Sequence, residues 1–224
     1  MKIIARIRNG YEGKFGVPRQ SGLVEEVVST VVFEPEFRVP EALRGIEGFT
    51  HLWLLWAFDR AERETWSPTV RPPRLGGNQR IGVFATRSPY RPNAIGLSCV
   101  RLLGTETGSE GTVLKVAGAD LMNGTPIYDI KPYLPYTDCR PEATGGFTDS
   151  TEKRRVEVEI PAELEETISP EDMKALKAVL REDPRPAYQD DPDRVYAFEF
   201  CGHHVEFRAG GQRLTVLQIR PSGE

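Results

Sequence analysis

The sequence predicts a mainly β protein, with a β-barrel over residues 1–145 and a small α+β unit over residues 151–224. Two observations support this prediction. Up to about residue 140, short runs of β-branched and aromatic residues alternate with glycine and proline, which is typical of an all-β domain. The stretch 144–150 is polar and contains glycine, as linkers do, and a strong helix-start signal lies shortly after it.

Six runs in the first unit predict strands, because they are rich in β-branched or aromatic residues and several alternate with a period of two. They are Lys2–Arg8, Glu25–Phe33, His51–Asp59, Arg80–Thr86, Leu97–Leu103 and Thr112–Ala117. Closing such a set into a barrel would remove the exposed sheet edges. The aromatic run His51–Phe58 is interpreted mainly as a core strand with an ordinary histidine.

The second unit should contain one helix and four strands. Ser169 suits a helix N-cap, Pro170 suits the first helical position, and two acidic residues follow in the first turn. An Asp-Pro step should end this helix at about Glu182. The predicted strands, of which the last two are joined by a Gly-Gly turn, are Arg155–Ile160, Val195–Phe200, His204–Arg208 and Leu214–Ile219.

Charge is unevenly distributed along the chain. The formal net charge is −4, yet residues 65–105 contain six arginines, no lysine and no acidic residue. This arginine window carries +6 and leaves −10 for the rest, so any RNA would have to be met locally. Guanidinium pairs bidentately with phosphate and carboxylate, which favours anion recognition, although a solvated basic strand edge gives the same pattern. The arginines are Arg71, Arg74, Arg80, Arg87, Arg91 and Arg101.

Several function classes lack their sequence signals. The three cysteines are far apart, have no C-x-x-C spacing and form no recognisable ligand set with the three histidines, so we expect reduced thiols and no metal. The motifs of dinucleotide-binding, P-loop, serine-hydrolase and zinc-protease sites are absent. The longest apolar run is too short to span a bilayer and the first residues are charged, so we expect a cytoplasmic protein without a membrane partner.

Four segments gather groups that bind or catalyse. The glycine-rich loop Gly13–Gln20 ends in groups suited to a purine and a carboxylate, and Asp59 ends the aromatic run. Arg87 and Arg91 lie in a turn stiffened by two prolines, which lowers the entropy lost on meeting an anion. Residues 120–136 combine an Asn-Gly turn with acidic, basic and phenolic side chains. The alternatives are structural: a core strand and ordinary turns that close the barrel.

Several strings of residues jointly resemble the TrmO family, also called TsaA-like or YaeB-like. They are Val17–Gln20, Thr69–Asn78, Val83–Ser88 with Arg91–Asn93, and Asp129–Pro135. A further similar string, Asp183–Tyr188, lies near the C-terminus. The resemblance spans nearly the whole chain, and the strings are specific as a set.

The resemblance implies a methyltransferase that uses S-adenosylmethionine and is built on an unusual β-barrel. Members of the family methylate N6 of threonylcarbamoyladenosine beside the tRNA anticodon, as homodimers with the cofactor site near the subunit interface. Where many relatives have Asp-Gly-Thr-Pro, this chain has Asn123 in place of the aspartate, so the role of that carboxylate is open here. Carried over by match, the cofactor pocket would be lined by Pro18, Arg19, Gln20, Asp59, Arg87, Leu97, Asn123, Gly124, Thr125 and Pro126.

The chemistry that the resemblance implies needs alignment above all, because the methyl group must lie in line between sulfur and N6. The attacking nitrogen also carries a carbonyl, so loss of its proton should assist transfer. Asp129 is the first candidate base, and Tyr133 or Tyr136 the next, from their placement among polar residues.

Substrate recognition is assigned to three basic residues. Arg74 and Arg91 are predicted to pair with the threonylcarbamoyl carboxylate, and Lys131 is placed with them as substrate-binding. Two other functions stay open at this stage. The barrel could be a non-catalytic sensor or adaptor that binds a nucleotide or S-adenosylmethionine, or an enzyme that acts on a small metabolite.

Overall fold

The computed structural model describes residues 1–60, 65–72, 75, 79–151, 155–185 and 191–223. Strands dominate these residues, which confirms the mainly β class. Six strands pair in the order β1-β2-β7-β6-β3-β8, and β8 pairs back to β1, so they form a closed barrel. Their bounds are β1 Ala5–Arg8, β2 Val28–Phe33, β3 His51–Ala57, β6 Ile95–Gly108, β7 Gly111–Ala117 and β8 Pro126–Pro132.

Strand β8 corrects the sequence interpretation. The run Arg80–Thr86 was expected to form a barrel strand, but it contains only β5 (Ile81–Gly82), which pairs with β4 (Thr69–Val70), and a 3₁₀ turn, η5 (Val83–Ala85). The sixth barrel strand is Pro126–Pro132, which the sequence placed in a polar turn. Its two prolines lie at the strand ends, where a missing N–H does least harm to the ladder.

The barrel core follows the two-residue period of its strands. Leu52, Leu54 and Trp56 of β3 point into the core, whereas the residues between them face outward. Gly96 of β6 is opposite Trp56, and a Cβ at Gly96 would lie 2.2 Å from the indole ring. A side chain cannot fit there, so this glycine lets the tryptophan lie flat against β6.

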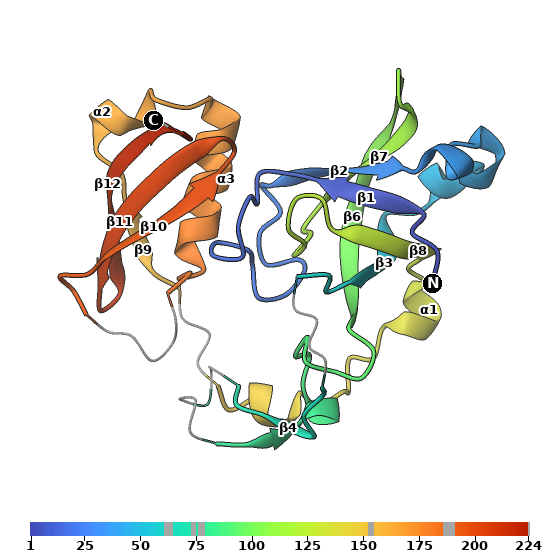
Figure 1. The fold of residues 1–224 in the computed structure, drawn as a ribbon, viewed down its shortest axis with the longest axis horizontal. Helices are drawn as coiled ribbons and strands as arrows, with labels where there is room; N and C mark the ends of the chain where they lie inside the picture. The colour runs from blue at the N-terminus through green and yellow to red at the C-terminus, as the bar shows by residue number, and fades with distance from the viewer. Residues whose placement is uncertain (61–64, 73–74, 76–78, 152–154, 186–190, 224) are drawn as a thin grey trace.

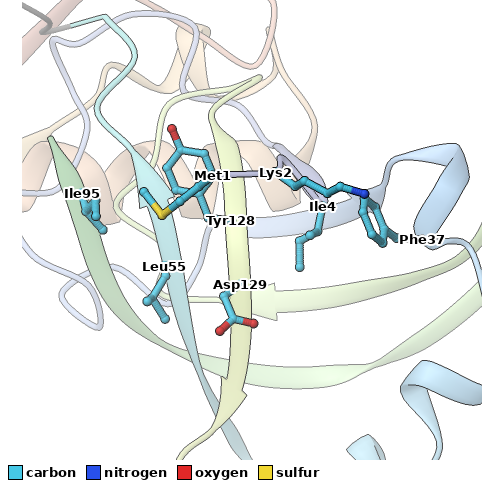
Figure 2. A pocket seen from close by; sticks show the side chains of 8 residues that line it. All are labelled: Met1, Lys2, Ile4, Phe37, Leu55, Ile95, Tyr128 and Asp129. Atoms are coloured by element: carbon cyan, nitrogen blue, oxygen red, sulfur yellow. The ribbon is translucent and has the colours of Figure 1, made fainter. Parts of the chain in front are cut away.

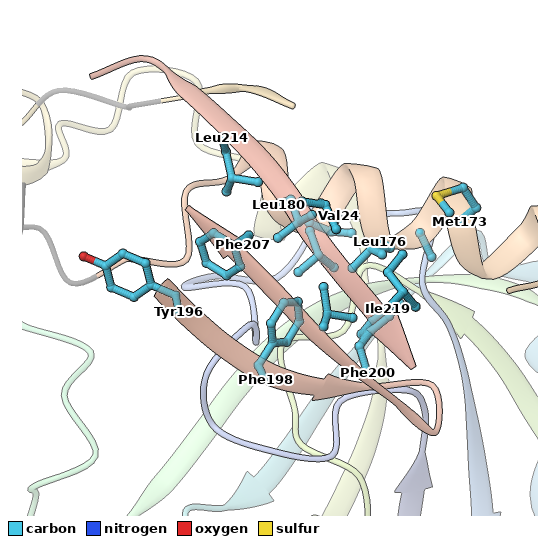
Figure 3. Packing of buried hydrophobic residues seen from close by; sticks show 14 of the residues in the cluster. Val24, Met173, Leu176, Leu180, Tyr196, Phe198, Phe200, Phe207, Leu214 and Ile219 are labelled. Atoms are coloured by element: carbon cyan, nitrogen blue, oxygen red, sulfur yellow. The ribbon is translucent and has the colours of Figure 1, made fainter. Parts of the chain in front are cut away.

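The C-terminal unit is one sheet covered by one longer helix. The sheet order is β10-β11-β12-β9, and helix α3 (Pro170–Arg181) packs on it. Ser169 caps this helix, with its Oγ accepting from the Asp172 backbone N–H at 3.1 Å, as predicted. Figure 3 shows the aromatic and aliphatic side chains between the helix and the sheet. The strands are β9 Glu157–Glu159, β10 Val195–Phe200, β11 His203–Gly210 and β12 Arg213–Pro221.

A long loop after β1 joins the two cores. Tyr11, Val24 and Val27 belong to the core of the C-terminal unit, although they lie in the N-terminal part of the chain. Tyr11 forms a β-bridge with Phe200, and this loop reaches toward α3 in Figure 1. The cofactor loop predicted from the sequence is part of this connection. Short helices complete the chain: η1 Pro35–Phe37, η2 Pro40–Leu43, η3 Ile46–Gly48, α1 Pro135–Asp138, η6 Gly146–Thr148 and α2 Ala162–Glu165.

Within the described ranges, no helix combines the length and the apolar character needed to cross a membrane.

Candidate functional site

A buried chain of hydrogen bonds lies at the start of β6. Trp56 Nε1 donates to Ser98 Oγ at 2.9 Å, and Ser98 Oγ donates to Asp120 Oδ1 at 2.5 Å. Both Trp56 and Ser98 are buried, so the chain connects the barrel core to a carboxylate at its edge. Because a hydroxyl that donates and accepts has a fixed orientation, Ser98 holds the Asp120 carboxylate in place.

Asp120 has an unusual environment for an acid. Burial raises the pKa of its carboxyl group, while the hydrogen bond from Ser98 and the charge of Arg87 act in the opposite direction. No cation of the described residues lies at ion-pair distance from this carboxylate. A largely buried carboxylate without a paired cation favours a positively charged ligand group.

The loop Pro18–Gly22 packs against β6 and against the segment that leads to Asp120. Arg87 Nη1 donates to Gln20 Oε1 at 2.6 Å, which brings together two residues that the sequence assigned to the cofactor pocket. The backbone N–H of Cys99 donates to Ser21 Oγ at 3.2 Å, and Gly22 N–H donates to the Gly118 carbonyl at 2.8 Å. These bonds tie the loop to β6 and to the segment that leads to Asp120.

The Asn-Gly turn lies next to the end of β3. Gly124 has φ +84, a left-handed conformation that glycine adopts without strain. Arg60, which follows the exposed Asp59, donates from Nη2 to the Asn123 carbonyl at 3.1 Å and so ties the turn to the segment after β3. Asn123 Oδ1 accepts from the Asn9 backbone N–H at 3.3 Å. An aspartate could accept this same bond, so asparagine preserves the structural part of the position's role.

Thr125 and Pro126 complete this turn. Both are buried, and the Thr125 carbonyl accepts from the Ile7 backbone N–H at 3.2 Å. Pro18 is buried as well, whereas Leu97 is 51% exposed on the outer face of β6. Leu97 therefore provides apolar surface on the outer face of β6, whereas its neighbour Ser98 points inward and bonds Asp120.

Asp129 lies on the same outer face as Leu97. In the strand register Leu55 is opposite Leu97 on one side and Asp129 on the other, so the three form a row across β6, β3 and β8. Two strand spacings separate Leu97 from Asp129, about 10 Å. Asp129 Oδ1 accepts from its neighbour's backbone N–H, Ile130 N, at 2.9 Å, and its Oδ2 pairs with Lys131 Nζ at 3.0 Å.

A depression of about 330 Å³ adjoins this row. Figure 2 shows Leu55 and Asp129 projecting from neighbouring strands on the same side of the sheet. The volume lies at the lower end of the range for small-molecule sites. The depression is lined by Met1, Lys2, Ile4, Phe37, Leu55, Ile95, Tyr128 and Asp129.

Tyr133 follows directly after β8 and belongs to an aromatic group. Its ring lies 5.7 Å from Trp53 and 6.2 Å from His51, measured between centroids. Desolvation raises the pKa of the Tyr133 phenol above its ordinary value, which already lies well above neutral pH. A protonated phenol is a poor proton acceptor, so this environment favours Asp129 over Tyr133 as the base.

Arg91 braces a turn. Its Nη1 donates to the carbonyls of Val83 at 3.2 Å and Thr86 at 2.7 Å, and its guanidinium lies 5.7 Å from the Phe84 ring centroid. The two hydrogen bonds hold the turn that presents Arg87. Arg74, the other arginine predicted to bind the substrate carboxylate, lies outside the described residues.

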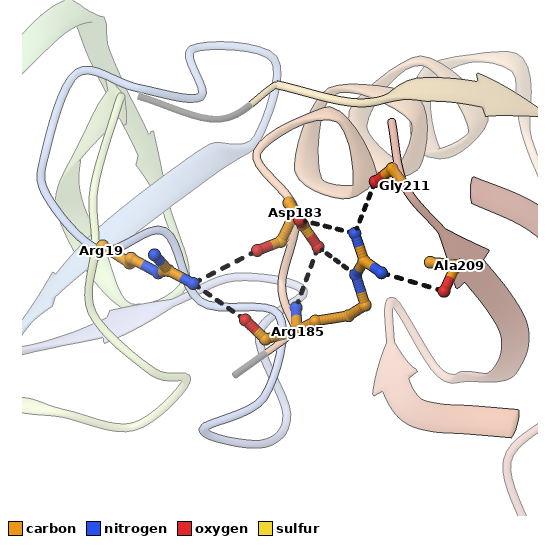
Figure 4. Close-up of polar contacts among 5 residues, drawn as sticks. All are labelled: Arg19, Asp183, Arg185, Ala209 and Gly211. Atoms are coloured by element: carbon orange, nitrogen blue, oxygen red, sulfur yellow. Dashed lines mark hydrogen bonds and ion pairs between the residues drawn. The ribbon is translucent and has the colours of Figure 1, made fainter. Parts of the chain in front are cut away.

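Arg19 points away from Gln20 and toward the C-terminal unit. Its Nη2 donates to the carbonyls of Asp183 at 3.4 Å and Arg185 at 2.9 Å. Those carbonyls are held by a buried pair: Arg185 Nε and Nη2 donate to Asp183 Oδ1 at 2.8 Å and Oδ2 at 3.0 Å. Figure 4 shows this network, which continues to the carbonyls of Ala209 and Gly211. The Arg19 side chain thus fastens the predicted cofactor loop to the second unit.

The sequence reasoning missed part of the site. Gln20, Arg87 and the Asn123–Gly124 turn were identified by resemblance, but Ser98 and Asp120 were not. A serine between apolar residues of a predicted strand was the available signal for Ser98. Nothing local indicated its bond to Asp120, because the two are 22 residues apart. In the part of the chain that the structure describes, no group of three or more His, Cys, Asp or Glu side chains could hold a metal ion.

Comparisons with known proteins agree with this architecture. The family model described as the tRNA-methyltransferase O N-terminal domain matches residues 6–139, and that of the TrmO C-terminal domain matches residues 153–222. The chain is 38% identical to the tRNA (adenine(37)-N6)-methyltransferase of Escherichia coli over 226 residues, covering 97% of this chain and 96% of that protein.

A relative from Pseudomonas aeruginosa, described as the putative S-adenosylmethionine-dependent methyltransferase RcsF, is 41% identical over 204 residues, or 86% of this chain and 85% of the relative. The crystal structure of TrmO from Pseudomonas aeruginosa superposes with a TM-score of 0.77 at 32% identity, covering 97% of this chain and 96% of that one. On the family models and these full-length similarities, the chain belongs to the tRNA-methyltransferase O family.

Proposed function

We propose that this protein transfers a methyl group from S-adenosylmethionine to N6 of an adenine in tRNA. The observation that carries the proposal is the contact between Gln20 and Arg87, an arginine whose charge also acts on the Asp120 carboxylate. Family membership supports the reaction class, since the Escherichia coli relative is a tRNA (adenine(37)-N6)-methyltransferase.

The chemistry of the donor set fits S-adenosylmethionine. The cofactor has a carboxylate, an ammonium group, a positively charged sulfur and an apolar, planar adenine. Arg87 and the Gln20 amide suit the carboxylate, and Asp120 suits a positive group. Leu97 offers apolar surface for the adenine. We assign the Arg19 side chain to domain fastening rather than to the cofactor, because two carbonyls of the C-terminal unit already engage it.

Bound S-adenosylmethionine would supply an activated methyl group, so the chain's own task is placement and proton removal. Asp129 is the proposed general base, with its carboxylate oriented by the Ile130 N–H and by Lys131. It lies on the sheet face that Leu97 shares, which suits a substrate adenine held over this row. Lys131 would hold the carboxylate in place until the N6 proton transfers to it.

The substrate that fits the arginine window is threonylcarbamoyladenosine, which adds an anionic carboxylate to the reacting adenine. Arg74 and Arg91 are the proposed partners of that carboxylate, Arg91 through guanidinium nitrogens other than the Nη1 that braces its turn. A site built for this group leaves its own donors unsatisfied when the group is missing, which can lower kcat/KM by about 10⁴-fold.

We further propose a cytoplasmic homodimer. The outer face of β3, β6 and β8 carries Trp53, Leu55 and Leu97, which a second copy would cover. A contact there would also enclose the row that ends in Asp129, and would therefore exclude water from the reacting groups.

The test of the substrate compares anticodon stem-loops that differ only in the threonylcarbamoyl group. The expected kcat/KM is far higher with the group present, and Arg91→Lys should lose most of this preference because lysine keeps the charge without the planar fork. Equal kcat/KM values for both RNAs in the wild-type enzyme would show that it does not recognise the threonylcarbamoyl group. That result would refute the carboxylate assignment.

A further inference from the structure

Two aromatic side chains form an exposed surface outside the barrel. Trp66 is 52% exposed and Phe84 is 71% exposed, and their rings lie 6.2 Å apart with planes inclined by 29°. We call this pair the Trp66–Phe84 platform. Aromatic side chains are enriched at binding interfaces, and an exposed apolar patch often marks a binding site because its contact with water is unfavourable.

Hydrogen bonds fix the backbone of the turn that carries Phe84. Phe84 is the middle residue of η5, whose first residue Val83 is buried. The Val83 carbonyl accepts from Arg91 Nη1 at 3.2 Å and from Thr86 Oγ1 at 2.8 Å, so the turn is fixed on both sides. The Val83 N–H donates to the Pro68 carbonyl at 2.9 Å, which ties η5 to the segment that carries Trp66. Little further ordering is needed when a ligand meets the rings.

Exposed arginines lie close to the platform in the sequence. Trp66 and Phe84 both lie in the arginine window, where Arg71, Arg80 and Arg87 are exposed. Among the described arginines of the window only Arg101 forms an ion pair, with Glu25 at 3.2 Å. An exposed aromatic pair in an arginine-rich segment, with the Arg91 guanidinium 5.7 Å from the Phe84 ring, matches the faces of nucleobases joined by phosphates.

We propose that the Trp66–Phe84 platform stacks an unpaired base of the substrate RNA, next to the adenine that is methylated. This inference rests on the proposed function, and it adds a base-recognition site to it. Phe84 is three residues before Arg87, which contacts the cofactor loop through Gln20, so the platform adjoins the proposed cofactor site. Loop bases are unstacked and available for such contacts, unlike those of a helix.

A second copy of the chain is the less favourable occupant. A two-fold interface centred on the platform would bring the same patch of each subunit together. The arginine window of each subunit would then lie near that of the other, and like charges would repel. RNA carries a negative phosphate beside each base, so it can meet the arginines and the aromatic rings together.

The test measures KM for an anticodon stem-loop separately from KM for S-adenosylmethionine. Phe84→Leu keeps apolar bulk but removes the ring, and Trp66→Leu does the same for its partner. Each should raise the RNA KM by about 5-fold to 150-fold, the range expected for one lost base stack, and leave the cofactor KM unchanged. Phe84→Trp should restore the wild-type RNA KM. Phe49→Leu is the matched control, since Phe49 is 36% exposed outside the arginine window and should not change either KM.

Direct binding separates this inference from the proposed function. The stem-loop should quench tryptophan fluorescence in the wild-type protein, and Trp66→Leu should remove most of that quenching. Absence of quenching together with an unchanged RNA KM in both leucine variants would overturn the platform while leaving the methyltransferase assignment intact. A Phe84→Leu protein that sediments as a monomer, where the wild type is a dimer, would also overturn it by assigning the rings to a subunit interface. Quenching without methyl transfer to any tRNA would instead contradict the proposed function.

Discussion

Removing one partner of the buried ion pair in the C-terminal unit should be among the most destabilising single changes to the fold. Arg185 is 3% exposed and Asp183 is 7% exposed, and the Arg185 guanidinium donates to four acceptors between 2.8 and 3.1 Å. Arg185→Met removes these donors and leaves the Asp183 carboxylate buried without its cation. Breaking one partner of such a pair destabilises by about 3–5 kcal/mol, which corresponds to a fall in Tm of about 6–20 °C for a chain of this size.

The assay is urea denaturation followed by circular dichroism, with a double-mutant cycle. Asp183→Asn is the second change, because asparagine tolerates the left-handed backbone at this position, where φ is +49. The double variant should be less destabilised than the sum of the single variants by about 0.5–3 kcal/mol. Additive effects, or a cost below about 1 kcal/mol for Arg185→Met, would refute the reasoning.

The same variant should weaken the cofactor loop. Arg19 donates to the carbonyls of Asp183 and Arg185, so loss of the pair removes ordered acceptors for its guanidinium. At temperatures where Arg185→Met stays folded, calorimetry should show weaker binding of S-adenosylmethionine than in the wild type. A surface control, Arg213→Met, removes an exposed arginine of β12 and should leave both stability and binding nearly unchanged.

Three further predictions concern the site and the assembly. Burial raises the Asp120 pKa above the roughly 3.9 of an unfolded aspartate. The unfolding free energy of the wild type relative to Asp120→Asn should therefore fall as pH rises from about 4 through the raised pKa. A difference in unfolding free energy that does not change with pH would contradict this. Calorimetry should detect S-adenosylmethionine binding with a chelator present, and binding that returns only with zinc would be contrary to expectation. Sedimentation at micromolar concentration should give about twice 25.1 kDa, and an active monomer would exclude the dimer.

The fold was predictable wherever local pattern decides structure. Helix α3 begins at the predicted proline, because the N-cap serine and the acidic first turn are local signals. Strand β10 matches its predicted bounds, because its run of β-branched and aromatic residues is also a local signal. Strand β8 was not predictable from pattern, because its polar residues face outward and its prolines resemble turn punctuation. Only its pairing with β1 and β3 makes it a strand.

The site, like the fold, was predictable only where local motifs indicate it. The Gln20–Arg87 contact follows from two motifs, but their meeting across 67 residues is a property of the fold. The Trp56–Ser98–Asp120 chain was invisible in sequence, since each member has an ordinary local interpretation. Arg19 was placed with the cofactor because its neighbours belong there, whereas its direction depends on carbonyls more than 160 residues away.

The central claim is methyl transfer to an adenine of tRNA. The most direct measurement is mass spectrometry of nucleosides from tRNA incubated with the protein and S-adenosylmethionine labelled in its methyl group. The account predicts one labelled methyl on N6 of threonylcarbamoyladenosine, with release of S-adenosylhomocysteine that requires tRNA, and a loss of most label with Asp129→Asn. Tightly bound S-adenosylmethionine with no label in any nucleoside would contradict the account and indicate a binding protein instead.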